Sequence, residues 1–259
     1  MRVIALTYNY DLGKLADIGR KWAGNVYRDK EFIFDYSAAS YATFVDKNPD
    51  KMLHLYTDDV DLMMRKMNLY NINQNNVSYY NYSLNLEKYK INLRYSFDVL
   101  TDFIYYAKSK DDFTVKIDND LIFHNKLPEP KENDVFVWKY ERLVRQGNPK
   151  MGEIKVIENT IKFLDLPIYN LGVLGIPVDY PEMELRNVCD EMVSIDISDV
   201  CDIPNTKIWH CCEQTANNWI FYTHKYNVVQ THNIVTHHFD NKHNCILGAK
   251  YLLKTIIQK

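Results

Sequence analysis

The segment 112–123 reads DFTVKIDNDLIF: an apolar run, then Asp118 and Asp120 with Asn119 between them, then a second apolar run. An extended chain points successive side chains to opposite faces, so both carboxylates face one side and Asn119 faces the other. Two neighbouring carboxylates at the end of a buried strand repel each other unless a cation neutralises them. A hard divalent ion such as Mg2+ or Mn2+, itself holding a diphosphate, is the simplest solution. The segment therefore predicts a metal-diphosphate site at a strand end.

The first half of the chain alternates apolar runs with helical patterns around this segment. Strands are expected at 3–8, 52–57, 77–82 and 112–117, and helices at 15–26, 36–45, 61–67 and 92–108. Such alternation is typical of a mostly parallel sheet with crossover helices, and such sheets bind ligands at the carboxyl ends of their strands. The polar clusters at 8–10, 58–59 and 118–120 each follow an expected strand. We therefore expect them to converge on one edge of the sheet.

The second half of the chain changes in character after residue 123. Strands are expected at 135–140 and 226–235, helices at 179–193, 209–222 and 246–257, and a glycine-bearing apolar segment at 166–177. The chain contains no internal repeat and no linker long enough to separate two independent domains. The prediction is a single α/β domain over 1–259, with a nucleotide-binding half at 1–125 and an acceptor-side half at 126–259.

Composition excludes several classes of protein. The chain has 259 residues, of which 46% are hydrophobic, so it can bury a full globular core. A net charge of −3 argues against a nucleic-acid-binding protein, which normally has a basic face. No run approaches the roughly 18 apolar residues of a membrane span, and the N-terminus lacks a signal-peptide pattern. The five cysteines are an odd number, so a reducing, cytoplasmic location is expected.

An Asp-x-Asp pattern alone is a weak indication of a metal site. The chain contains a second one at Asp59-Val60-Asp61, and an isolated pattern of this kind is as often a solvated turn. The apolar flanks of Asp118 and Asp120, and the long helix expected before them, favour a metal site at this pair. An EF-hand is excluded because the required glycine and the distal glutamate are missing.

The order of motifs along the chain resembles that of nucleotide-sugar glycosyltransferases of the GT-A fold, of the glycogenin and lipopolysaccharide-galactosyltransferase type. The similar parts are the first strand with 7–9, the helix from 92, the segment 116–120, the Asn-x-Gly strand at 169–173, the acidic-Gln helix start at 212–218, and the late His and Lys at 238–242. The resemblance covers most of the chain. It implies a GT-A-like domain with a smaller acceptor-side sheet, and transfer of a sugar to a glycan or protein acceptor.

The resemblance also implies a donor site. Asp118, Asp120 and His238 would hold Mn2+ or Mg2+, with His237 as the alternative to His238, because adjacent residues of a strand point different ways. The donor would be a nucleoside-diphosphate sugar, with a UDP-sugar favoured. The other residues implied in donor binding are Thr7, Tyr8, Asn9, Tyr10, Arg94, Asn119 and Lys242. Arg94 and Asp98 lie one turn apart, so an ordinary helix ion pair is the alternative for them.

On the acceptor side, the resemblance implies Asn170, Gly172 and Gln214 as binding residues and Glu213 as the catalytic base. A carboxylate at a helix start that faces a cleft can take a proton from an acceptor hydroxyl. Favourable charge at a helix N-terminus is the alternative role of Glu213. If the reaction retains the anomeric configuration, Gln214 or a backbone carbonyl becomes the more important neighbour.

Three other interpretations compete with this one. A nucleotidyltransferase also places paired carboxylates at strand ends, but the loop 9–13 lacks the glycine-rich, basic character that would support it. A carbohydrate-binding protein would use the carboxylates only structurally. A zinc site could draw on His210, Cys211, Cys212, His237, His238, His243 and Cys245. Zinc sites favour spaced pairs, whereas these cysteines are vicinal or isolated.

Overall fold

A seven-stranded sheet forms the centre of the computed structural model, which describes residues 1–8, 29–83, 95–143, 167–194, 212–238 and 241–254. The strand order is β10-β6-β9-β4-β1-β2-β3. The strands are β1 (Arg2–Thr7), β2 (Leu53–Thr57), β3 (Val77–Asn81), β4 (Thr114–Ile117), β6 (Asp134–Val137), β9 (Val173–Ile176) and β10 (Asn227–Gln230). Strands β1 to β4 are mutually parallel, as are β6 and β10, and β9 runs antiparallel between β4 and β6. The predicted mostly parallel α/β sheet is confirmed.

Two small antiparallel sheets extend from this central sheet. Strand β5 (Leu121–Phe123) pairs with β11 (Val235–His237), and β7 (Lys139–Leu143) pairs with β8 (Pro167–Asn170). The turn after β4 leads directly into β5. A strand from the end of the chain is therefore brought against the segment around which the fold was predicted.

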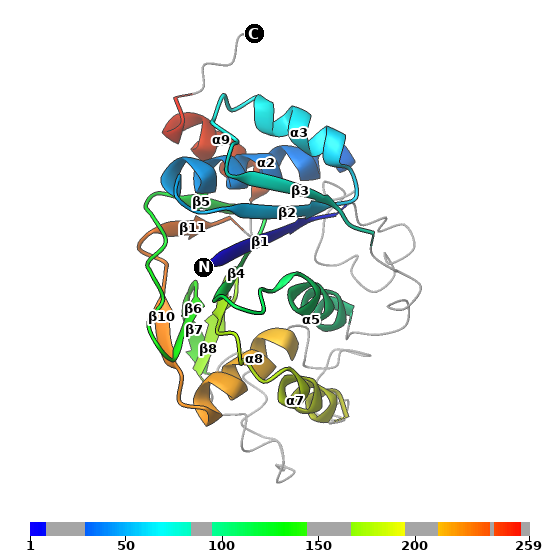
Figure 1. Cartoon of the computed structure of the whole chain (residues 1–259), viewed down its shortest axis with the longest axis vertical. Helices are drawn as coiled ribbons and strands as arrows, with labels where there is room; N and C mark the ends of the chain where they lie inside the picture. The colour runs from blue at the N-terminus through cyan, green and yellow to red at the C-terminus, as the bar shows by residue number, and fades with distance from the viewer. Residues whose placement is uncertain (9–28, 84–94, 144–166, 195–211, 239–240, 255–259) are drawn as a thin grey trace.

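Helices cover both faces of the central sheet (Figure 1). On one face lie α2 (Lys30–Lys47), α3 (Val60–Asn68) and α9 (Lys242–Leu252). On the other lie α5 (Tyr95–Ala107), α7 (Glu182–Ser194) and α8 (Cys212–Thr223). Among the described helices, none is long and apolar enough to cross a lipid bilayer.

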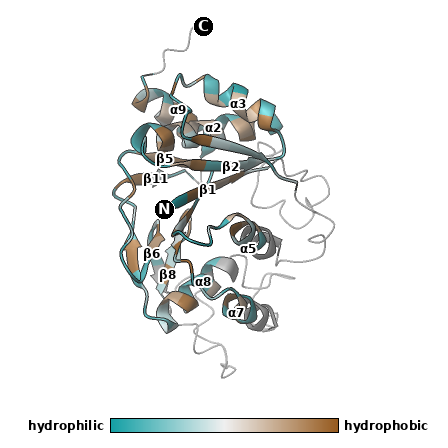
Figure 2. Cartoon of the chain, in the orientation of Figure 1, coloured by the Kyte–Doolittle hydropathy of each residue, from teal (hydrophilic) through white to brown (hydrophobic). Residues whose placement is uncertain are grey.

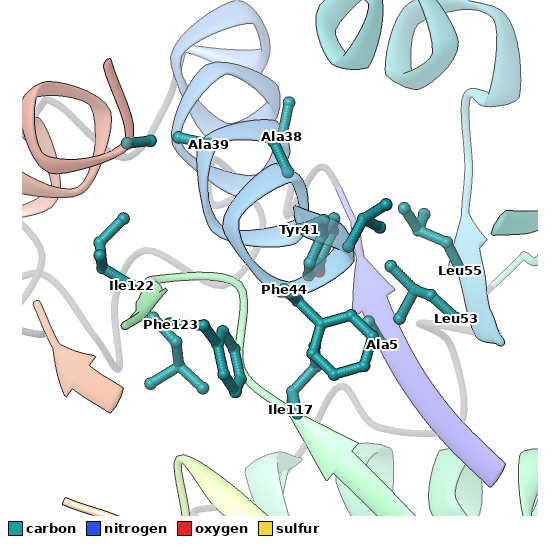
Figure 3. Packing of buried hydrophobic residues seen from close by; sticks show 14 of the residues in the cluster. Ala5, Ala38, Ala39, Tyr41, Phe44, Leu53, Leu55, Ile117, Ile122 and Phe123 are labelled. Carbon is teal, nitrogen blue, oxygen red and sulfur yellow. The ribbon is translucent and has the colours of Figure 1, made fainter. Parts of the chain in front are cut away.

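The core on the first face is built around α2, which is buried from Ile33 to Val45 apart from Asp35. Phe44 packs edge-on against Phe123 of β5 at a centroid distance of 5.2 Å, and Ala5 and Leu55 come from the sheet (Figure 3). A second core lies on the other face, between the sheet and α5, α7 and α8. Hydrophobic colouring is concentrated on the strands and on the helix faces turned toward them (Figure 2).

Several element boundaries differ from those expected because local hydrogen bonds decide them. Helix α2 begins at Lys30, not near 36, because Asp29 caps it and accepts a hydrogen bond from the Glu31 N–H at 2.9 Å. Helix α9 begins at Lys242, not near 246, because Asn241 caps it in the same way through the His243 N–H. The expected helix at 15–26 lies outside the described residues.

Two expected strands are each divided in two. The strand at 135–140 breaks at Trp138, whose N–H donates to Asn170 O at 2.9 Å, so the chain leaves the central sheet for the β7–β8 sheet. The strand at 226–235 breaks at a turn in which the Ile234 N–H donates to Thr231 O at 2.9 Å. This turn lets β11 leave β10 and reach β5.

Candidate functional site

Asp118 and Asp120 lie in the turn between β4 and β5, and backbone hydrogen bonds fix that turn. The Asp118 N–H donates to Gly172 O at 2.8 Å, and the His238 N–H donates to Asp120 O at 2.9 Å. The Leu121 N–H donates to Ser40 Oγ of α2 at 3.2 Å. Three separate parts of the chain therefore hold the turn. Asp120 is 4% exposed, whereas Asp118 is half-buried.

His237 ends β11 and reaches both carboxylates. Its Nε2 lies 3.0 Å from Asp120 Oδ1 and 3.8 Å from Asp118 Oδ2. Trp138 packs edge-on against the imidazole at a centroid distance of 5.0 Å. Within the described part of the chain, Asp118, Asp120 and His237 are the group of three carboxylate, imidazole or thiol side chains whose ligand atoms all lie within 4.8 Å of one another.

The tautomer of His237 follows from its neighbour Asn170. Asn170 Oδ1 accepts a hydrogen bond from the Gly172 N–H at 2.9 Å, while its Nδ2 donates to Glu141 Oε1 at 2.9 Å. These two bonds fix the orientation of the amide, so its oxygen faces His237 Nδ1 at 3.2 Å. The imidazole Nδ1 must then carry the proton and donate it. In the neutral ring, Nε2 therefore presents a lone pair to Asp120.

The contact between His237 Nε2 and Asp120 Oδ1 then joins two acceptors. Asp120 Oδ1 is buried and accepts no hydrogen bond from the described residues. Burial lowers the pKa of His237, while Asp118 opposes that shift, so the neutral ring is favoured. Two acceptors 3.0 Å apart can both bind one cation placed between them. One imidazole nitrogen and two carboxylates suit Mn2+ or Mg2+, so these residues fit a divalent metal.

The structure thus brings His237, the alternative of the two histidines, to the carboxylates. His238 contributes its backbone N–H to Asp120. Burial lowers the pKa of the His238 imidazole, and the neighbouring His237 and His124 lower it further. Its side chain therefore lies among other imidazoles. Sequence alone could not separate the two histidines, because the register of β11 against β5 pairs His237 with Leu121 and so decides which ring faces the aspartates.

Two lysines contact the same carboxylates. Lys116 Nζ donates to Asp118 Oδ1, and Lys242 Nζ donates to Asp120 Oδ2. Burial lowers the pKa of Lys242 to about 8. Of these two lysines, the sequence predicts only Lys242 at the site. The signal that could have indicated Lys116 is its spacing, because residues two apart in a strand share a face.

The acceptor-side residues line a cavity of about 90 Å³ beside the carboxylates, between β4, β8, α5 and α8. Lys116, Asp118, Asn170, Gln214 and His237 are among its lining residues. Gly172 also belongs to it, and a Cβ at this position would lie 2.8 Å from His237 Nδ1. The glycine of the Asn-x-Gly segment therefore leaves the space that the imidazole occupies.

Glu141 is a site residue that the sequence analysis missed. Its Oε1 accepts from Asn170 Nδ2 at 2.9 Å, and its Oε2 accepts from Gln214 Nε2 at 3.3 Å. It thus joins two of the predicted acceptor residues. The pairing of β7 with β8 places it there, and no local pattern in the sequence indicates that pairing.

The remaining predicted residues divide into three groups. Thr7 is fully buried and shares a hydrogen bond of 2.8 Å with the Tyr41 hydroxyl, so it supports β1 from within. Tyr8 and Asn119 are half-buried, and Tyr8 has its pKa raised by burial and by Asp58, which lies after the neighbouring strand β2. Asn9, Tyr10 and Arg94 lie outside the described residues. Glu213 falls in the first turn of α8, and the direction of its side chain lies outside the described part.

The cysteine and histidine side chains considered for zinc do not form a metal-binding cluster in the described part of the chain. Cys245 is buried with its Sγ 3.5 Å from Tyr36 O. The His243 ring packs on Phe32 at a centroid distance of 4.6 Å, whereas His237 lies at the carboxylates. His210, Cys211 and the side chain of Cys212 lie outside the described part.

Comparison with known proteins gives a likeness of structure. No protein-family model matches the sequence, and no curated protein matches it. The structure is similar to that of the galactosyltransferase LgtC in complex with donor and acceptor sugar analogues, with a TM-score of 0.53 and 12% identity over 100% of this chain and 97% of that chain. An active-site mutant of LgtC gives a TM-score of 0.50 with the same identity and coverage. At such identities the likeness shows the fold, and it confirms the predicted GT-A-like architecture.

Proposed function

We propose that this chain is a glycosyltransferase that moves a sugar from a nucleoside-diphosphate sugar, with a UDP-sugar favoured, to a glycan or protein acceptor. The observation that carries the proposal is the buried contact between Asp120 Oδ1 and the lone pair of His237 Nε2. That contact is suited to a cation that binds both atoms, and it lies in the turn after β4 of a sheet that has the fold of a sugar-transferring enzyme.

The residues of the donor site have distinct tasks in this proposal. Asp118, Asp120 and His237 hold Mn2+ or Mg2+, which when bound would stabilise the negative charge that develops on the departing diphosphate. Lys242 lies against Asp120, and this contact supports its proposed role of contacting a phosphate beside the metal. Tyr8, Asn9, Tyr10, Arg94 and Asn119 stay proposed donor contacts, whereas the burial of Thr7 favours a supporting role.

The acceptor side centres on the cavity beside Asp118. Asn170 and Gln214 line it, and Glu141 binds the amides of both. Because each amide keeps one fixed orientation, their remaining polar atoms are directed at fixed points, as the recognition of sugar hydroxyls requires. Glu213 stays the proposed base. We also propose that residues 1–125 bind the nucleotide and that 126–259 bind the acceptor, within one domain.

Calorimetric titration of UDP, GDP and CDP, each with and without Mn2+, tests this function. We expect one of the three to bind with a Kd at least ten times lower in the presence of the metal, since a hard cation and a diphosphate stabilise each other. Magnesium should substitute for manganese in the same titration. If no nucleotide binds in the presence of either metal, the proposed function is wrong.

A further inference from the structure

Both carboxylates of the site are paired with a lysine from within the chain. Lys116 of β4 contacts Asp118, and Lys242 at the start of α9 contacts Asp120. The exposed fractions of the four side chains are 8% for Lys116, 31% for Asp118, 13% for Lys242 and 5% for Asp120. The two ammonium groups therefore cancel the two carboxylates in a setting where solvent screens little.

Lys116 is fixed in this position. It lies inside β4, two residues before Asp118, and its Nζ also donates to Leu171 O at 3.2 Å. Strand β4 pairs with β1 on one side and β9 on the other, so its backbone cannot shift independently. Among the described residues that line the cavity, Asp118 is the only carboxylate. The buried Lys116 ammonium therefore has no second carboxylate there with which to pair.

Lys242 is held less firmly. It opens α9, and the N-terminus of a helix is an unfavourable place for a positive charge. Its Nζ contacts Asp120 and lies 5.8 Å from the Tyr36 ring centroid. Its helix therefore offers it no stabilisation, and a phosphate beside the carboxylates would be a competing partner. The two lysines are thus unequal: one is built into the sheet, and the other is positioned by its counter-ion.

These pairings oppose the binding of a bare divalent cation. A metal ion at Asp118 and Asp120 would lie within a few ångströms of both ammonium groups, at carboxylates whose charge is already cancelled. A diphosphate changes that balance, because each of its phosphates carries negative charge. Lys242 could then pair with a phosphate, and Asp118 and Asp120 would hold the metal beside the diphosphate while Lys116 stays in place.

We propose that Lys116 is an internal counter-ion that makes metal binding depend on the nucleotide, so that the protein takes up the metal–nucleoside diphosphate complex and binds the bare metal only weakly. The inference rests on the proposed function. It assigns Lys116 a positioning and selectivity role, not a catalytic one. Its consequence is that a free divalent ion does not occupy the site when no sugar nucleotide is present.

Direct titration of Mn2+, followed through the electron paramagnetic resonance signal of the free ion, tests the inference without an activity assay. It is run with and without UDP, GDP or CDP on the wild-type chain and on Lys116→Met. Methionine keeps most of the side-chain volume and removes the charge. Lys51→Met is the matched control, because Lys51 and Lys116 are both 6% exposed as whole residues. Lys51 is ion-paired to Glu129 and lies just before β2, at the opposite edge of the sheet from the carboxyl ends of the strands.

We expect the wild-type chain to bind Mn2+ at least about ten times more tightly with a nucleotide than without one, and Lys116→Met to bind bare Mn2+ at least about ten times more tightly than the wild type. Lys51→Met should match the wild type. Equal affinity for bare Mn2+ in Lys116→Met and the wild type would overturn the inference. So would a wild-type chain that binds Mn2+ equally well with and without nucleotide.

These outcomes are distinct from a failure of the proposed function. If the wild-type chain binds Mn2+ neither alone nor with any of the three nucleotides, the glycosyltransferase proposal itself is overturned, and the inference with it. If Lys116→Met does not fold, Lys116→Gln replaces it, because the amide can still donate to Leu171 O without carrying a charge. The affinity of the wild-type chain for Mn2+, measured with and without nucleotide, tests whether metal binding depends on the nucleotide even if neither variant folds.

Discussion

His237 Nε2 and Asp120 Oδ1 lie 3.0 Å apart, although His237 belongs to β11, the last of the described strands, and Asp120 to the turn after β4. The antiparallel pairing of β11 with β5 produces this contact. Asn170 fixes the imidazole from the other side through Nδ1. Proteins orient a metal-binding histidine through a hydrogen bond from its other ring nitrogen, and the bond from His237 Nδ1 to Asn170 Oδ1 is of this kind.

The two histidines give the first prediction. His237→Gln should weaken metal-dependent nucleotide binding by about tenfold or more, because it removes the nitrogen that faces the carboxylates. His238→Gln is the matched control and should stay within about twofold of the wild type, since its contact with Asp120 is through the backbone. Calorimetry of the nucleotide in Mn2+ measures both. The opposite order of effects would identify His238 as the ligand.

Asp120 gives the second prediction. Asp120→Asn should lower nucleotide affinity in Mn2+ by about 100-fold or more and abolish sugar-nucleotide hydrolysis or transfer, because a neutral amide is a poor ligand for a hard cation. Its thermal unfolding should stay cooperative. Unchanged activity in Asp120→Asn would contradict the assignment of this carboxylate.

Asp134→Asn is the control for the burial of that carboxylate. Asp134 is 3% exposed and accepts hydrogen bonds from Asn227 Nδ2 and from the Lys131 N–H, at the opposite end of β6 from the site. We expect this variant to lose about 1–3 kcal/mol of stability and to keep nucleotide binding. Asp120→Asn should therefore lose nucleotide binding and still unfold cooperatively, whereas Asp134→Asn should lose stability and keep nucleotide binding.

The sequence predicts the carboxylate pair and the type of sheet because both depend on local spacing. The spacing in 112–123 puts Asp118 and Asp120 directly after an apolar strand, and the repeated strand-helix pattern implies parallel strands. The order of motifs adds the GT-A-like resemblance, which the structural likeness confirms. These features need no knowledge of which strands pair across the chain.

The partners of that pair could not be predicted in the same way. His237 is selected over His238 by a strand register, and Glu141 reaches Asn170 through the β7–β8 pairing. Thr7, which the resemblance implies as a donor contact, is fully buried, and its hydroxyl shares a hydrogen bond of 2.8 Å with that of Tyr41 in α2. In each case tertiary packing decides the direction of a side chain, and one sequence does not contain that information.

His54 of β2 gives a third prediction, on stability. Burial lowers its pKa to about 4, and the charge of Arg2 adds to this shift. The unfolded chain, with a histidine pKa near 6.5, therefore takes up a proton before the folded chain does. Stability that is present above about pH 6.5 should be lost progressively as the pH falls toward about 4. His54→Gln should reduce this loss in urea unfolding followed across that range.

The control for this stability prediction is His232→Gln. His232 is exposed, so its substitution controls for the replacement of a histidine by glutamine outside the core. A pH dependence in His54→Gln identical to that of the wild type would mean that other groups cause the loss. Because His54 lies in β2 and hydrogen-bonds Tyr80 at 2.9 Å, the variant also reports on the edge of the sheet.

Gly172 gives the last prediction, because an alanine Cβ there would lie 2.8 Å from His237 Nδ1 and 3.2 Å from Asn170 Oδ1. Gly172→Ala should displace the imidazole and weaken Mn2+-dependent nucleotide binding by about tenfold, since metal ligands need closely held geometry. Gly248→Ala is the control: its Cβ would lie 3.4 Å from Ile122 in ordinary contact, so helix α9 should gain up to about 1 kcal/mol while binding stays unchanged. Thermal unfolding and calorimetry separate the two effects, and a Gly172→Ala variant with wild-type binding would show that His237 does not need this space.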